Sequence, residues 1–389
     1  MVAQGPLNGI TIIDLTRVLA GPFCTLLLAD LGARVIKVES PGKGDDARAF
    51  GPFANGRSAY FTSLNRGKES IALDLRSSKG RRIFEALLSA ADVLTENFRP
   101  GALARLGYDW EKLHRMFPRL VYASTSGFGQ TGPHADRPAY DIIVQGLGGL
   151  MSLTGYPGNP PTRVGTSLGD IAAGLFTAVG IEAALWHRCQ MGVGMRVDVA
   201  MLDCQIAILE NAIARYRATG KVPGPCGARH PSIAPFECYE SADGFVIIAA
   251  GNDTLFKNCC SALGRPELAK DERFSNNAAR CENVDALKAT IESILRAHGT
   301  DHWLKVLAVA GVPCGPINDV AQAMAHPQTK ARNMIVSVDD PSLEHFRVAG
   351  NPIKLSGVPD PTIRPAAPDL DEHHQAILAE LASKKTANS

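Results

Sequence analysis

The fold is decided by residues 9–38, GITIIDLTRVLAGPFCTLLLADLGARVIKV, near the amino terminus. The β-branched run at 9–15 predicts a strand. The apolar segment at 23–31 predicts a helix that Gly32 ends, and residues 33–38 predict a second, buried strand. A strand, a glycine-containing turn, a helix and another strand in this order form a βαβ unit, which implies a parallel sheet.

The alternation of strands and helices continues along the chain. Strands are predicted at 71–75, 92–96, 120–124 and 196–200, and helices at 140–154, 171–189 and 201–219. Seven prolines and glycines break the pattern at 220–235. After the break we expect a strand at 245–250, helices at 253–263, 284–297 and 302–310, a strand at 346–355 and a last helix at 370–383. The sequence therefore predicts an α/β protein with a large domain at 1–219, a linker at 220–235 and a small α+β domain at 236–330.

Composition limits the classes of partner. The chain has 389 residues, of which 45% are apolar and 20% charged, as is typical of a globular protein. A net charge of +1 at pH 7 argues against nucleic acid or an anionic membrane as the main partner. Nine cysteines without any C-x-x-C spacing indicate reduced thiols, a cytoplasmic location and no metal site. The sequence shows no signal peptide and no apolar run long enough to span a bilayer.

One glycine-rich motif suggests a nucleotide cofactor, but its surroundings disagree. Residues 127–132, GFGQTG, match G-x-G-x-x-G after a predicted strand. A dinucleotide site needs a helix to begin at the third glycine, and Pro133 and Pro138 prevent that. We therefore interpret the motif as a loop. No G-x-S-x-G is present, so a hydrolase triad has no support either.

Three short segments combine cations with side chains that can lie against a nucleotide base. They are residues 16–22, residues 65–68 and residues 96–101 followed by Arg105. We expect each to lie at the carboxyl end of a strand or in a loop beside one, where open α/β sheets bind their ligands. Arginine and lysine there could hold phosphates, although solvated loop charges are an equally simple explanation for any one segment.

A single acidic residue stands in the small-residue stretch 164–174, VGTSLGDIAAG, before a long apolar helix. In such a place Asp170 would ordinarily be a helix N-cap, accepting hydrogen bonds from free backbone amides. The glycine, serine and threonine residues around it would also let a ligand approach the carboxylate closely. Within the break, His230 is a further candidate for a cleft.

Several segments together resemble the family III CoA transferases, the formyl-CoA and carnitine CoA transferase group. The similar segments are LTRVLAGP at 15–22, GARVIKVE at 32–39, ENFRPG at 96–101, SGFG at 126–129, VAMLD at 199–203 and GVPCGPI at 311–317. The resemblance implies a Rossmann-like large domain completed by residues 331–389. It also implies an interlocked homodimer.

In that family an aspartate within Gly-Asp at the start of a helix is the covalent nucleophile, and the matching residue here is Asp170. The resemblance implies an aspartyl-CoA thioester intermediate. Such a carboxylate must stay ionised, so we expect backbone amides at the helix start to offset its desolvation. Gly251 and Asn252, in the loop 249–253, match the family's loop that supplies oxyanion donors.

The resemblance also implies that coenzyme A binds as part of an acyl-CoA substrate, with no tightly bound cofactor. The implied CoA-binding residues are Arg17, Val18, Ala20, Leu73, Arg76, Asn97, Phe98, Arg99, Arg105, Tyr140 and Met201. Two positions depart from the formyl-CoA transferase pattern, since Leu19 replaces a glutamine and Ser40 replaces an arginine. The first departure removes a donor to a small acid, which disfavours formate and oxalate.

The substrate is expected to be a dicarboxylic acid. The second half, notably HPSIAPF at 230–236, looks most like the succinyl-CoA:dicarboxylate branch, and a C4–C6 diacid such as itaconate is our expectation. Its distal carboxylate would need a cation, for which Arg66, Arg229 and His230 are candidates. Leu19 is a further candidate for substrate binding.

Other functions stay open at this point. The same fold hosts α-methylacyl-CoA racemases, which use a His and an Asp as an acid/base pair, but Tyr140 stands where that family has its His. A non-enzymatic CoA-binding protein and a nicotinamide enzyme are more distant alternatives.

Overall fold

The computed structural model describes residues 5–387, and the chain separates into two compact units. The larger unit comprises residues 1–151, 163–220 and 326–389, and the smaller comprises 152–162 and 221–325. The smaller unit thus occupies the part of the chain in which the α+β domain is predicted. It also takes in most of the expected linker and a segment, 152–162, that no sequence pattern indicates.

A six-stranded parallel sheet forms the centre of the larger unit. Its strand order is β5-β2-β1-β6-β7-β8, with every neighbouring pair parallel. The strands are β1 (Thr11–Asp14), β2 (Arg34–Glu39), β5 (Glu69–Ala72), β6 (Val93–Glu96), β7 (Val121–Ser126) and β8 (Arg196–Ala200). The predicted α/β class, the parallel sheet and five of the strand positions are confirmed, whereas the strand predicted at 71–75 begins two residues earlier and ends at Ala72.

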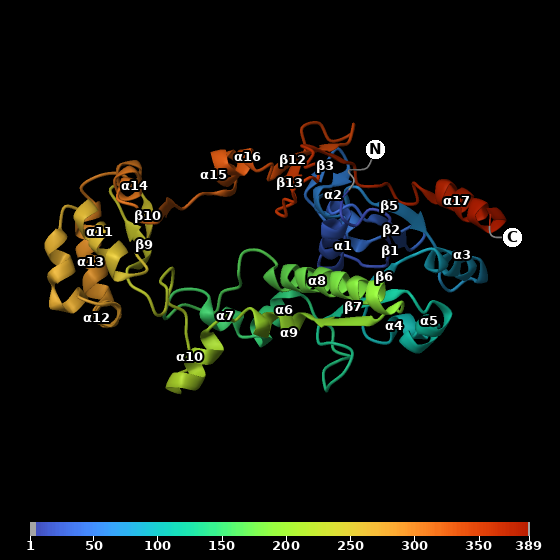
Figure 1. Ribbon diagram of the computed structural model, residues 1–389, viewed down its shortest axis with the longest axis horizontal. Coiled ribbons are helices and arrows are strands. Elements are labelled where there is room, and N and C mark those ends of the chain that lie inside the picture. Colours follow the sequence, from blue (N-terminus) through green and yellow to red (C-terminus); the bar gives the residue numbers. More distant parts are fainter. Residues whose placement is uncertain (1–4, 388–389) are drawn as a thin grey trace. The chain divides into compact units, whose positions relative to one another are not determined.

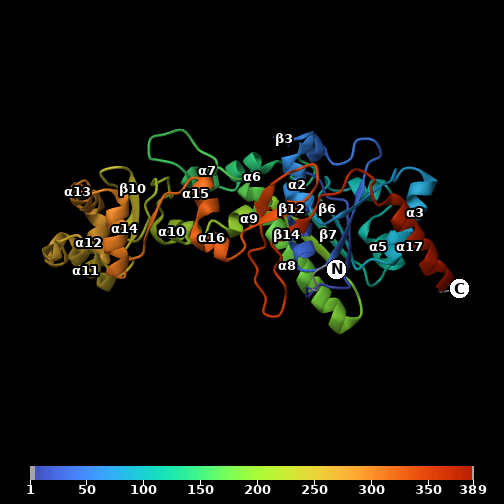
Figure 2. The same ribbon diagram turned by 90° about the horizontal axis from the view of Figure 1, so that it is seen from above.

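Successive strand residues point to opposite sides of this sheet, and both sides carry apolar residues. Helices therefore cover both faces. One face packs against α1 (Ala20–Asp30) and α8 (Leu168–Met191). The other packs against α3 (Ser78–Ser89), α5 (Trp110–Met116) and α17 (His374–Ala387), so the carboxyl-terminal helix returns to the sheet beside α3 (Figure 1, Figure 2). The alternating apolar residues on the two faces are Ile12, Val35, Val93 and Val121 on the first and Ile13, Ile36, Leu94 and Tyr122 on the second.

The helix α8 packs unusually close to α1. A Cβ at Gly174 would lie 2.6 Å from the backbone oxygen of Ala20, so only glycine permits this approach. By length and composition alone α8 could also cross a membrane, but its buried residues, including Ala178 and Ile181, pack on the sheet. It starts three residues earlier than the sequence pattern predicts.

Two predicted helices are each broken in two. The segment 140–154 contains α6 (Asp141–Leu147) and α7 (Leu150–Leu153), separated by Gly148 and Gly149, of which the second has a φ of 85°. The segment 201–219 contains α9 (Met201–Ala207) and α10 (Ala212–Thr219), and Glu210 between them has a φ of 56°. Residues in left-handed backbone conformation cannot continue an α-helix, which explains both interruptions.

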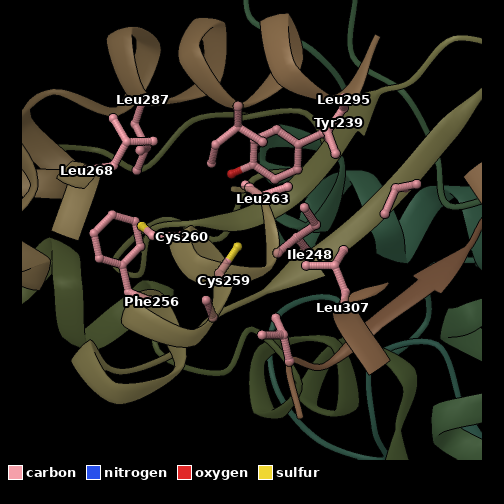
Figure 3. Close-up of a cluster of buried hydrophobic side chains, with 14 of the residues drawn as sticks. Tyr239, Ile248, Phe256, Cys259, Cys260, Leu263, Leu268, Leu287, Leu295 and Leu307 are labelled. Carbon is pink, nitrogen blue, oxygen red and sulfur yellow. The ribbon is translucent and has the colours of Figure 1, made fainter. Parts of the chain in front are cut away.

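The smaller unit has its own hydrophobic core. An antiparallel sheet of order β11-β10-β9, made by β9 (Phe236–Glu240), β10 (Phe245–Ala249) and β11 (Cys314–Pro316), packs against helices. The core gathers Tyr239, Ile248, Phe256, Cys259 and Leu307 (Figure 3). The helices of this unit are α11 (Asp253–Ala262), α12 (Asn277–Glu282), α13 (Val284–Leu295), α14 (Thr300–Val309) and α15 (Val320–Ala325), with short 3₁₀ turns at Pro266–Lys270 and Glu272–Phe274.

Short elements complete the larger unit, and the sequence pattern indicates few of them. Of the strand predicted at 346–355, only Arg347–Ala349 forms a strand, β13. The remaining elements are a 3₁₀ turn at Asp46–Ala49, β3 (Phe53–Ala54), β4 (Arg57–Ser58), α2 (Ala59–Asn65), α4 (Ala102–Arg105), α16 (Pro327–Ala331), β12 (Ile335–Asp339), β13 (Arg347–Ala349) and β14 (Ile363–Pro365).

Candidate active site

The site lies where the chain order in the sheet reverses. From β1 the chain first adds β2 and β5 on one side, and later adds β6, β7 and β8 on the other. The loops that follow the adjacent strands β1 and β6 therefore diverge and leave a crevice at the carboxyl ends of the strands. Two cavities of the larger unit open there, with volumes of 590 and 220 Å³.

The larger cavity is rich in arginine. Its lining includes Arg17, Arg76, Arg81 and Arg105, which are groups suited to phosphates. Arg17 and Phe98 line both cavities, and the Arg17 guanidinium lies 5.3 Å from the centre of the Phe98 ring. Four of the predicted CoA-binding residues are thus brought together here, and Arg81 joins them without having been predicted.

The smaller cavity holds the predicted nucleophile. Asp170 of α8 lines it, beside the turn that follows β1 and the loop that follows β6. Tyr140, which is 74% exposed, and the buried Met201 are at its edge. The other predicted residues lining this cavity are Val18, Leu19, Ala20, Asn97, Phe98 and Arg99, and Arg137 lines it as a residue that the sequence reasoning missed.

The carboxylate of Asp170 is poorly solvated and, among residues 5–387, accepts no hydrogen bond. The helix N-cap is Ser167, and Asp170 is the third residue of the helix, so the interpretation of Asp170 as an N-cap is wrong. Its pKa is raised to about 7, chiefly by burial and also by the charge of Asp141, while Arg163 opposes this rise. The helix start therefore does not offset desolvation as fully as the sequence argument expects.

Asp141, at the start of α6, fixes the backbone beside Asp170. Its Oδ1 accepts a hydrogen bond of 2.8 Å from the amide of Gly169, and its Oδ2 accepts one of 2.9 Å from Arg163. The Gln145 side chain donates to both oxygens and accepts from the amide of Val164 at 2.9 Å. Sequence reasoning missed this residue, although it directly follows Tyr140 in the segment compared with the racemases.

Packing requires the glycine that precedes Asp170. A Cβ at Gly169 would lie 2.7 Å from the Val144 side chain and 3.0 Å from Oδ1 of Asp141. Real Cβ contacts are longer than this, so any side chain at 169 would push α6 and α8 apart. Because Gly169 has no side chain, the Asp141 carboxylate has room to bind the backbone at the start of α8, next to Asp170.

The segment 65–68 does not line either cavity of the crevice. Arg66 is 3% exposed and makes hydrogen bonds of 2.6 and 2.7 Å with both oxygens of Asp30. Lys68 is likewise buried, and its ammonium group contacts Asp14 at 3.3 Å. Both residues precede β5, so they lie at the amino end of that strand, and the expectation that this cluster joins the ligand-binding edge is wrong. Leu73, a predicted CoA contact, is buried in the hydrophobic core beneath the sheet.

The remaining predicted residues belong to the smaller unit. Arg229 pairs with Glu237 at 3.1 Å and Asp285 at 2.8 Å, so its charge is already matched. The Nδ1 atom of His230 accepts a hydrogen bond from the amide of Ser232. Gly251 follows β10 with open space around its Cα, and Asn252 caps α11, with its Oδ1 accepting from the Leu255 amide at 2.9 Å.

Two further expectations concern the loop 127–132 and metals. The segment after β7 forms bends and no helix until α6, so its interpretation as a loop is confirmed. Between residues 5 and 387, no cluster of histidine, cysteine, aspartate and glutamate has an arrangement suited to a metal ion.

A family model, curated relatives and a solved structure are similar to this chain. The sequence model of CoA-transferase family III matches residues 7–374. The chain is 50% identical to an acetyl-CoA:oxalate CoA-transferase of Acetobacter aceti, over 98% of this chain and 97% of that protein. It is 41% identical to a succinate–glutarate CoA-transferase of Agrobacterium fabrum, over 97% and 96%. The crystal structure of a CAIB/BAIF family protein from Brucella suis is similar with a TM-score of 0.85 and 43% identity, covering 97% of this chain and all of that one.

Proposed function

Because this chain belongs to CoA-transferase family III, we propose that Asp170 is the nucleophile with which it moves CoA from an acyl-CoA to a dicarboxylic acid. Transfer of CoA between acyl-CoA thioesters and carboxylic acids is the activity of the family. The observation that carries the role of Asp170 is its position in the smaller cavity, without a hydrogen-bond partner among the described residues and with a pKa near 7.

The proposed reaction has two halves. The Asp170 carboxylate attacks the thioester carbonyl, which gives a mixed anhydride and releases CoA thiolate. The thiolate then attacks the aspartyl carbonyl of the anhydride, leaving an aspartyl-CoA thioester and freeing the first carboxylate. The acceptor carboxylate runs the same steps in reverse, so the thioester is conserved. A carboxyl group with a pKa of about 7 is partly ionised at neutral pH, and its carboxylate has little water to shed before it attacks.

The two cavities suit the two ends of coenzyme A. The arginine-lined larger cavity would take the phosphates of the nucleotide, with Phe98 available to contact the base. The pantetheine arm would pass Arg17 and Phe98, which border both cavities, and bring the thioester to Asp170.

The acceptor has two candidates. The sequence argument favours succinyl-CoA with a C4–C6 diacid such as itaconate, and a relative named for succinate and glutarate supports a diacid of this length. A relative 50% identical is named for acetyl-CoA and oxalate, which favours the shortest diacid in spite of Leu19. Of the cations expected to bind the distal carboxylate, Arg66 and Arg229 both hold carboxylates of the chain. Arg137 lines the smaller cavity and forms no ion pair within the described residues, so we propose it for this role.

We also propose that the enzyme is a cytoplasmic, interlocked homodimer. Support comes from apolar side chains that the single chain leaves exposed. They are Ile142, Ile143 and Leu147 on α6, and Leu175, Phe176, Val179 and Trp186 on α8. Light scattering coupled to gel filtration should give twice the monomer mass, and a monomer at all concentrations would exclude the dimer.

Trapping of the intermediate tests the mechanism. The enzyme is incubated with succinyl-CoA or acetyl-CoA and then with hydroxylamine, which converts an aspartyl thioester into a hydroxamate. We expect inactivation and a hydroxamate at Asp170 by peptide mass spectrometry, and neither without acyl-CoA. An unmodified Asp170 in an inactivated enzyme would refute the assignment.

A matrix of donors and acceptors tests the substrate. Acetyl-CoA and succinyl-CoA are each combined with oxalate, glutarate, itaconate and mesaconate, and the acyl-CoA products are read by mass spectrometry. The donor and acceptor pair with the highest kcat/KM decides between the two candidates. Exchange of an α-proton with D₂O in the absence of any acceptor would instead favour a racemase.

A further inference from the structure

The turn that separates the two cavities contains a strained residue. Val18 follows β1 with a φ of 68°, in the left-handed region. A β-branched side chain rarely adopts this conformation, and such residues persist only where their surroundings hold them. Thr16 lines the larger cavity, Arg17 lines both cavities, and Val18 and Leu19 line the smaller one. The strain therefore lies in the wall between them.

A buried ion pair in the lining of the larger cavity holds this turn. The ammonium group of Lys37, on β2, donates to the backbone oxygen of Thr16 at 2.7 Å. Oδ1 of Asp45 accepts a hydrogen bond of 3.1 Å from the amide of Val18 and one of 2.9 Å from the amide of Ala47. Lys37 and Asp45 pair with each other at 2.8 Å, and their side chains are 1% and 0% exposed. Two linked charges thus bond to the backbone at Thr16 and at the amide of the strained residue itself.

A second clamp acts from the adjacent loop. The Oδ1 atom of Asn97 accepts from the amide of Arg17 at 2.8 Å, and its Nδ2 donates to the oxygen of Arg17 at 2.7 Å. The turn is therefore bonded to β2, to the loop before residue 46 and to the loop after β6. These are the segments that also line the two cavities.

We propose that Lys37 and Asp45 are positioning residues that hold the Val18 turn in its strained form and so preorganise the passage between the two cavities for CoA. The inference rests on the proposed function, because it assigns the passage to the pantetheine arm. A buried ion pair gives little net stability compared with apolar residues of the same volume, so its bonds to this backbone are a stronger reason for its presence.

Calorimetric titration with free CoA tests the inference through a double-mutant cycle. Asp45→Asn retains an acceptor for the Val18 amide but removes the ion pair, and we expect CoA affinity to fall at least tenfold. Val18→Gly adopts the same φ without strain, so in that background Asp45→Asn should cost threefold or less. Equal losses in the two backgrounds, or an Asp45→Asn enzyme that binds CoA within twofold of wild type, would overturn the proposal.

Controls separate positioning from stability. Asp30→Asn breaks the buried pair with Arg66, which lies outside both cavities, and should lower the melting temperature without changing CoA affinity. If Asp45→Asn does not fold, the double variant Lys37→Met, Asp45→Asn removes both charges and leaves neither one buried alone. We expect the double variant also to lose less CoA affinity in the Val18→Gly background than in the wild-type background. Failure of the wild-type enzyme to bind CoA would refute the proposed function and this inference together, whereas binding by wild type with no effect of Asp45→Asn refutes only the inference.

Discussion

Replacement of Asp170 by asparagine should stabilise the protein at alkaline pH. The pKa of this carboxyl group is raised from 3.8 to about 7 by burial and by Asp141. Above pH 3.8 the unfolded chain therefore releases a proton that the folded chain keeps, and the free energy of unfolding falls as the pH rises towards 7. The whole interval corresponds to roughly 4 kcal/mol, at about 1.4 kcal/mol for each pH unit. Asparagine cannot ionise, so Asp170→Asn removes this penalty.

Urea unfolding at about pH 4 and about pH 8, followed by circular dichroism, measures the effect. We expect the variant to be more stable than wild type by up to about 4 kcal/mol at the higher pH and by much less at the lower. Asp203→Asn is the matched control, because Asp203 is the third residue of α9 but is exposed. A variant no more stable than wild type at about pH 8, or an equal gain at both pH values, would refute the reasoning.

Three further predictions follow from the same site. The value of kcat/KM should rise with pH through about 7 as Asp170 ionises, and a flat pH profile would contradict that role. Asp141→Asn removes a like charge, so it should move the rise to lower pH. Gly169→Ala should lower the free energy of unfolding by roughly 1–3 kcal/mol because its Cβ has no room, whereas Gly165→Ala, with open space, should not; equal denaturation midpoints would show the packing argument to be wrong. Arg105→Ala should raise KM for acyl-CoA roughly tenfold or more and leave KM for the acceptor acid unchanged, and an unchanged KM for acyl-CoA would remove the larger cavity from the CoA path.

The alternating pattern of strands and helices was sufficient to predict the central sheet. Strands such as Thr11–Asp14 and Arg34–Glu39 are short runs rich in β-branched residues beside helical segments, and this local signal is strong. The broken helices could not be predicted in the same way. Glu210 adopts a left-handed backbone conformation, and the helix propensity of glutamate gives no sign of it. The short strands β12 and β14 pair across distant segments, so no local periodicity marks them.

The site was predictable where residues follow a strand of the sheet, and less so elsewhere. Arg17 and Asn97 come directly after β1 and β6, so the topology alone brings them together. Arg66 has the same local appearance but precedes its strand, and its charge is taken up by Asp30. Asp141 could not be distinguished from an ordinary helix-start aspartate, because its partners, Gly169 and Arg163, lie more than twenty residues away.

The close contact of Gly174 with Ala20 has a consequence for redesign of specificity. Ala20 lines the smaller cavity, and Gly174 lies one helical turn after Asp170 on the same helix. Asp170 and the first residue of α1 are therefore held at a spacing that the close packing of the two helices sets. A new acceptor acid would have to be accommodated by side chains alone. Leu19 is half-buried, Tyr140 is exposed, and both line the smaller cavity. We expect laboratory evolution of acceptor specificity to select substitutions at these two positions.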